Sequence, residues 1–129
     1  DDQADMLVAR VDTNGTLDST FDGDGIRTVD FFGSRDKAQG MALQQNGQIV
    51  LAGGISEPDG GGGIGVQKQG LARLNADGSM DAAFGNSGIV TTLTGTSMGA
   101  NALAIQSDGQ IVTVGGTNGV DFALARYCA

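Results

Sequence analysis

The sequence has no histidine and no tryptophan, and its 129 residues include one cysteine, one proline and one tyrosine. Without histidine, the usual general base of serine hydrolases is missing. The segment from Gly95 to Gly99 matches the nucleophile pattern G-x-S-x-G, but we therefore expect it to be a turn between strands. The single Cys128 excludes an internal disulfide and leaves two readings open, a cross-link between subunits or a buried, inert thiol.

Positive charge and long apolar runs are also scarce. Seven lysines and arginines stand against 15 acidic residues, and the net charge of −8 argues against nucleic acid, which needs clustered basic residues. No apolar run approaches the roughly 18 residues of a spanning helix, so we expect no membrane span. The sequence starts at Asp1 without a signal peptide, which fits a mature secreted protein and fits a fragment boundary equally well.

A tandem repeat dominates what is present. Two segments of the chain are similar in sequence: LVARVDTNGTLDSTFDGDGIRTVD, which begins at Leu7, and LARLNADGSMDAAFGNSGIVTTL, which begins at Leu71. In this alignment Arg10 matches Arg73, 63 positions later (73 − 10 = 63). The text AQGMALQQNGQIVLAGG from Ala38 returns 62 positions later as ANALAIQSDGQIVTVGG. A third start, ALARYCA, repeats GLARLNA after 53 positions (126 − 73), which gives the natural period. A period of this size indicates one supersecondary unit per copy.

The repeat divides a single domain, 1–129, into four segments. They are a first repeat at 6–55, a glycine-rich insertion at 56–69, a second repeat at 70–121 and a closing strand at 122–127. The 23 glycines, the turn signals and the lack of a helical period predict an all-β chain. The expected strands lie at 6–11, 26–31, 39–44, 48–52, 71–74, 89–93, 102–106, 110–114 and 122–127. They predict two four-stranded, propeller-like blades plus one extra strand.

The pattern FALARY, NADGS, D, FG, GIVTT and ALAIQSDGQIVTVGG resembles the bacterial delta-60 repeat. The resemblance covers nearly the whole chain outside the insertion and the first few residues. It implies propeller-like blades in extracellular or cell-surface bacterial proteins, and it brings no catalytic residues. The first copy departs from the pattern at Asp22-Gly23-Asp24-Gly25, and the last copy has Cys128 where the second has Asn75.

The extra strand bears on assembly, because the first and last strands are copies of one strand type. Two blades alone would leave strand edges and apolar faces open. A ring of several chains, a filament built by strand donation and a piece of a longer array all stay open. The predicted assembly residues are Met6, Leu7, Val8, Ala9, Arg10, Val11, Phe122, Ala123, Leu124, Ala125, Arg126 and Tyr127.

Two recurring charges predict structural ion pairs. Arginine recurs in the apolar strands as Arg10, Arg73 and Arg126, and aspartate follows as Asp18 and Asp81. An arginine inside an apolar strand needs a carboxylate partner. We therefore expect one Arg–Asp pair in each blade and favour it over a ligand site.

The first loop is unusually acidic. Asp18, Asp22 and Asp24 crowd around two glycines, and calcium takes carboxylate and carbonyl oxygens from such loops. The closing glutamate of a full calcium loop is missing, so we favour a turn held by local hydrogen bonds. No cofactor is otherwise expected.

We expect no enzyme. Paired carboxylates can hydrolyse glycosides, but sugar sites tend to carry aromatic rings, and this chain has one tyrosine and no tryptophan. The expected function is that of a non-enzymatic, extracellular structural subunit, whose partner is itself in a homo-oligomer or polymer formed by strand exchange and sheet stacking. The alternative is a lectin-like propeller, formed by oligomerisation, that binds glycans or a surface.

Overall fold

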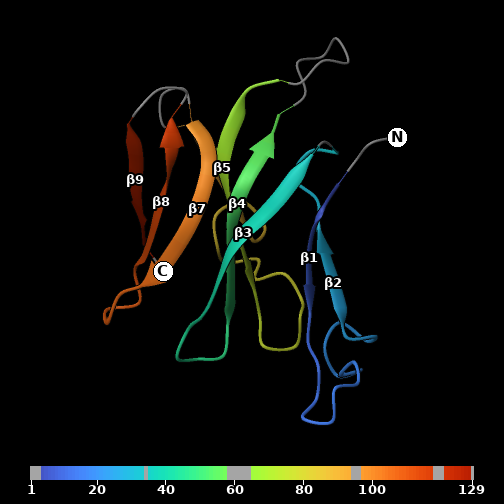
Figure 1. Ribbon diagram of the computed structural model, residues 1–129. Helices are drawn as coiled ribbons and strands as arrows, with labels where there is room; N and C mark the ends of the chain where they lie inside the picture. The colour runs from blue at the N-terminus through green and yellow to red at the C-terminus, as the bar shows by residue number, and fades with distance from the viewer. Residues whose placement is uncertain (1–3, 34, 58–64, 94–96, 118–120, 129) are drawn as a thin grey trace.

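The computed structural model describes residues 4–33, 35–57, 65–93, 97–117 and 121–128, and these residues form three antiparallel sheets (Figure 1). No helix occurs within these ranges, and so none that could cross a membrane. The strands are β1 (Met6–Ala9), β2 (Ile26–Val29), β3 (Asp36–Leu43), β4 (Ile49–Ser56), β5 (Gln67–Leu74), β6 (Ile89–Thr92), β7 (Ser97–Ile105), β8 (Ile111–Thr117) and β9 (Phe122–Tyr127).

The all-β prediction is confirmed, but the strands group differently from the expected two blades and one spare strand. The first sheet holds β1 and β2, the central sheet runs β3-β4-β5-β6, and the third sheet runs β7-β8-β9. The reason is that the sequence repeat begins at the third strand of a blade. Leu71 of the second copy pairs with Ala52 of the first, so the central sheet takes two strands from each of two copies.

Two expected loops are partly strand. Ser56 and Gln67, inside the predicted insertion loop, pair as the last residue of β4 and the first of β5. Ser97 to Gly99, inside the predicted turn, belong to β7. Composition misled in both cases because a backbone ladder forms with almost any side chain. Residues 58–64 and 94–96 of these two segments lie outside the described residues.

The three sheets are stacked in one direction, with the third sheet on the left of Figure 1 and the first on the right. We call the side of a sheet toward the first sheet its back and the other side its front. One core lies between the first sheet and the back of the central sheet and contains Met6, Val8, Phe21, Val29, Phe31, Ile49, Leu51, Ile55, Ala72 and Leu74. The other lies between the front of the central sheet and the third sheet and contains Val50, Ala52, Leu71, Phe84, Ala100 and Ile111.

Alternation along the strands explains this stack. In β4, Ile49 and Leu51 point to the back core, while Val50 and Ala52 point to the front core. A strand that is apolar on both faces needs a covered sheet on each side. The central sheet is therefore covered on both sides along β4 and β5, and the two outer sheets each have one open side.

Candidate functional site

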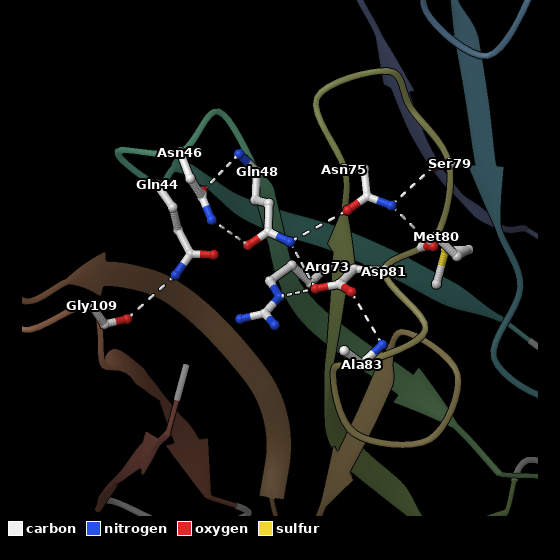
Figure 2. A network of polar contacts seen from close by, with 10 residues as sticks. All are labelled: Gln44, Asn46, Gln48, Arg73, Asn75, Ser79, Met80, Asp81, Ala83 and Gly109. Carbon is white, nitrogen blue, oxygen red and sulfur yellow. Dashed lines mark hydrogen bonds and ion pairs between the residues drawn. The ribbon is translucent and has the colours of Figure 1, made fainter.

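The polar centre of the second repeat copy is the pair of Arg73 and Asp81. Arg73 Nε donates to Asp81 Oδ2 over 2.7 Å, and both side chains are nearly buried (Figure 2). Gln48 Nε2 donates to the same oxygen over 2.8 Å, and the Ala83 amide donates to Oδ1 over 3.1 Å. The guanidinium carbon lies 4.5 Å from the centroid of the Phe84 ring, a cation–π distance. Together these contacts hold the loop after β5 in place.

The first copy repeats this geometry nearer to the surface. Arg10 Nε lies 2.7 Å from Asp18 Oδ2, and the guanidinium carbon lies 4.9 Å from the Phe21 ring centroid. Arg10 also donates through Nη1 to the carbonyl of Ala76, over 2.6 Å, and so ties the first loop to the second. The structure thus brings together both predicted ion pairs.

The two aspartates respond differently to their surroundings. Burial by itself would raise the pKa of Asp81, but hydrogen bonds from the Ala83 amide, Arg73 and Gln48 outweigh burial and lower it below 3.8. The side-chain and backbone hydrogen bonds from Thr20 chiefly lower the pKa of Asp18. Both carboxylates are therefore held as anions, as an ion pair requires.

Arg126 is the third member of the series, and it has no ion pair among the described residues. In the two earlier copies the aspartate stands eight residues after the arginine. Its side chain is exposed on the front of the third sheet. The expectation that the recurring arginine has a carboxylate partner is therefore not met at Arg126 within this part of the chain.

The three aspartates for which calcium was left open lie in one loop but point to separate partners. Asp18 is paired with Arg10, Asp22 Oδ1 lies 3.1 Å from Arg27 Nη1, and Asp24 Oδ1 accepts from the Ile26 amide over 2.8 Å. These contacts match the alternative reading, a turn held by local hydrogen bonds. Calcium at this loop stays a prediction.

The front of the third sheet carries several apolar side chains that no described residues cover. We call Val112, Val114, Phe122, Leu124 and Arg126 the C-terminal face. Phe122 is 85% exposed and Leu124 is 70% exposed. The repeat positions that correspond to Val114 and Leu124 in the central sheet, Ala52 and Leu71, are both 0% exposed because the third sheet covers them.

The back of the central sheet is open along β3. Met41 is 58% exposed and Leu43 is 65% exposed, although they share a face with the buried Leu51. Their counterparts in the next copy, Leu103 and Ile105, are packed against the core. The difference arises because the first sheet lacks the two strands that would correspond to β3 and β4.

Among the described residues, β1 and β9 each lack a neighbouring strand that their repeat counterpart in the central sheet has. In the described part of the chain β1 pairs with β2 alone, whereas the corresponding β5 pairs with both β4 and β6. Likewise β9 pairs with β8 alone and has no partner that corresponds to β6. Cys128 is exposed beside this edge, so the reading as a buried thiol is wrong.

Sequence analysis identified the terminal strands but missed Met41, Leu43, Val112 and Val114. The repeat could have identified them, since residues 41 and 103 occupy the same repeat position. If that position is buried in one copy, the same position in the other copy lies on a face that is also built to be covered. The sequence does not show where one blade ends and the next begins. That boundary decides in which repeat copy a given face is covered by a neighbouring sheet.

A cavity of ≈ 350 Å³ lies between two hairpin turns, and most of its lining residues have polar side chains. Its lining residues are Gln44, Gln45, Asn46, Ile105, Gln106, Ser107, Asp108 and Gly109. One hydrogen bond of 3.4 Å crosses from Gln44 Nε2 to the carbonyl of Gly109 (Figure 2). The lining offers amides and carbonyls but no aromatic ring.

Comparison with known families gives one match. A family model described as "Domain of unknown function (DUF5122) beta-propeller" matches residues 1–21 and 44–84. These ranges contain Arg10, Asp18, Arg73 and Asp81, the polar centres of both copies. The chain is therefore similar to a β-propeller-like repeat family, whereas the narrower delta-60 assignment stays a prediction. A search among curated proteins found no match.

Proposed function

We propose that this chain of β-propeller-like repeats is a structural subunit that assembles head to tail with copies of itself, and that β1 and β2 of one copy complete the blade opened by β7 and β8 of another. The observation that carries the proposal is the duplication of one strand type. β1 and β9 are both copies of β5, yet a blade has room for only one such strand beside β8.

The repeat fixes the register of the exchanged strand. In the complete blade, Ala52 lies opposite Leu71 and Val50 opposite Arg73. The third sheet keeps this register, with Val114 opposite Leu124. In the exchanged blade Val8 of the incoming copy takes the place of Leu124 and lies opposite Val114. Since β1 arrives already paired with β2, the exchange gives a four-stranded sheet where β9 gives a three-stranded one.

The open faces support the same arrangement. When β7 and β8 of one copy lie beside β1 of the next, the front of that hairpin faces Met41 and Leu43, as β7 faces β3 within one chain. The close approach inside the chain is visible at Gly40, whose added Cβ would meet Leu103 Cδ2 at 2.8 Å. Burying the exposed parts of Met41 and Leu43 contributes roughly 1 kcal/mol for each side chain, and the less exposed Val112 and Val114 contribute less.

A disulfide trap tests the exchange. In a Cys128→Ser background, Val8→Cys combined with Val114→Cys places two thiols directly opposite each other only in the exchanged register. We expect mild oxidation to give a ladder of covalent oligomers, read by non-reducing gel electrophoresis and by light scattering. Either single-cysteine variant gives at most a dimer.

The matched control is Leu7→Cys with Val114→Cys. Leu7 is 56% exposed whereas Val8 is 8% exposed, so random collision would favour cross-linking through position 7. In the exchanged sheet, position 7 points to the opposite face from position 114. More cross-linking at 7 than at 8, or a strictly monomeric protein at high concentration, would contradict the proposal.

The location outside the cell rests on the delta-60 resemblance and is part of the proposal. Fractionation of cells that produce the protein from its natural gene tests it. Recovery from the medium or the cell surface supports an extracellular structural role, and confinement to the cytoplasm refutes it.

A second candidate function is the lectin-like one, for which the cavity between the hairpin turns is the supporting observation. Its amide and carbonyl lining suits sugar hydroxyl groups, although it lacks a ring on which a sugar can stack. A glycan array separates the two functions. Specific binding that is lost in Gln44→Ala would favour the lectin, and a blank array with intact assembly would favour the structural subunit.

A further inference from the structure

Three carboxylates that lie far apart in the sequence meet where the first sheet joins the central one. Asp5 directly precedes β1, Asp30 directly follows β2, and Asp36 is the first residue of β3. One carboxylate oxygen from each residue lies within 4.8 Å of the other two. Three anions at this separation repel one another, and a cation at their centre would offset that repulsion.

Asp36 is the unusual member of the group. It is 2% exposed, and its Oδ2 accepts a hydrogen bond from the Phe31 amide over 2.7 Å. Its Oδ1 is buried and has no hydrogen-bond partner among the described residues. A buried carboxylate oxygen without a partner is costly, so such an oxygen calls for a ligand.

The cluster is not a requirement of the repeat. The corresponding residues of the second copy are Lys68 (5 + 63), Leu93 (30 + 63) and Met98 (36 + 62), and none of them is acidic. The second copy folds into the same strands without these carboxylates. The acidic group is thus particular to the junction between the first and central sheets.

We propose that Asp5, Asp30 and Asp36 bind a calcium ion that ties the ends of β1 and β2 to the start of β3. Calcium takes oxygen ligands at about 2.4 Å, so any two of its ligand oxygens lie at most about 4.8 Å apart, and the three carboxylate oxygens lie within that limit. Two of the three carboxylates are exposed and so leave room for water to fill the remaining coordination sites. Magnesium requires a smaller and more regular octahedron, which suits a cluster made from three separate chain segments less well.

Isothermal titration of the chelator-treated protein with calcium chloride tests the site directly. We expect saturable binding of one ion per chain and at least tenfold weaker binding by Asp36→Asn. Calcium also raises the Tm of the native protein and leaves that of Asp36→Asn unchanged. Because asparagine removes a buried charge without changing the side-chain shape, the variant is expected to fold, which circular dichroism checks.

Two further variants locate the ion. Asp30→Asn changes an exposed carboxylate of the cluster and weakens binding as well, whereas Asp24→Asn, in the acidic loop before β2, leaves binding unchanged. Loss of binding in Asp24→Asn with retention in Asp36→Asn would move the ion to that loop and overturn the proposal. Absence of binding heat with calcium at about 10 mM, well above the roughly 1 mM Kd of weak extracellular calcium sites, would also overturn it. The site does not depend on self-assembly, so a strictly monomeric protein that binds calcium would refute only the proposed function.

Discussion

Leu71 and Leu124 occupy the same position of the repeat, yet Leu71 is 0% exposed and Leu124 is 70% exposed. The difference lies in what each sheet packs against, because the third sheet covers Leu71 and no described residues cover Leu124. One chain therefore contains both the covered and the open form of a single surface. Leu71 is covered by the apolar side of another sheet, so a sheet of the same kind would fit over Leu124.

The open patch on β3 gives the first prediction. Replacing Leu43, which is 65% exposed, by glutamate is expected to shift the protein toward monomers, since the charge would be buried in the proposed contact between copies. The Tm should change little because the side chain faces solvent in the single chain. Leu93→Glu, at a site that is 55% exposed but beyond β6, is the control and keeps its assembly. Light scattering over a concentration series measures both variants, and equal assembly would contradict the contact.

The anchor of β9 gives the second prediction. Tyr127 Oη donates to Thr92 Oγ1 over 2.9 Å, which holds the last strand against the central sheet. Tyr127→Phe removes this hydrogen bond, which contributes about 1 kcal/mol to the packing of β9 on the central sheet, and leaves the ring in place. If β1 of another copy competes with β9 for β8, the variant assembles several-fold more readily, whereas a purely structural bond would leave assembly unchanged or reduce it. Sedimentation velocity at matched concentrations distinguishes the two results.

The ion pairs were accessible to sequence reasoning because both partners recur at the same spacing. Arg10 precedes Asp18 and Arg73 precedes Asp81 by eight residues, so one physical need explains both copies. The strands were also predictable, since their apolar residues and glycine turns are local signals. β9 lies at the predicted bounds, 122–127.

The grouping of strands and the acidic cluster were not predictable from local signals. A tandem repeat can be divided at any point of its period, so the sequence alone does not show whether Leu71 begins a blade or lies within one. Asp5, Asp30 and Asp36 come together through the pairing of Met6 with Val29 and the return of the chain into β3. Such proximity depends on topology, which spacing along the sequence does not encode.

The buried pair gives the third prediction, on pH dependence. Asp81→Asn is expected to lower the free energy of unfolding by about 3 kcal/mol at pH 7, since Arg73 loses its partner in a nearly buried site. The pKa of Asp81 in the folded chain lies below the ordinary 3.8, so the anion's contribution is present above that pH and is lost as pH falls through the folded value. The difference in unfolding free energy between native protein and variant should therefore begin to shrink below about pH 4 and continue to shrink as the pH falls further, as urea titrations would show.

The more exposed pair of the first copy is the control for that experiment. The side chains of Arg10 and Asp18 are 36% and 19% exposed, against 10% and 11% for Arg73 and Asp81. Asp18→Asn should therefore cost less than Asp81→Asn at neutral pH. An equal loss of unfolding free energy in both variants would mean that burial does not determine how much each ion pair contributes to stability.

A glycine in β4 gives the last prediction. A Cβ added to Gly53 would lie 1.7 Å from the carbonyl oxygen of Lys37, so Gly53→Ala must push β3 away from β4. We expect a loss of about 3 kcal/mol in the free energy of unfolding, the upper range for overpacking. Gly116→Ala is the matched control, because nothing lies within 4 Å of its added Cβ and alanine there also restricts the unfolded chain. Urea unfolding of both variants checks the prediction, which fails if Gly53→Ala is as stable as Gly116→Ala.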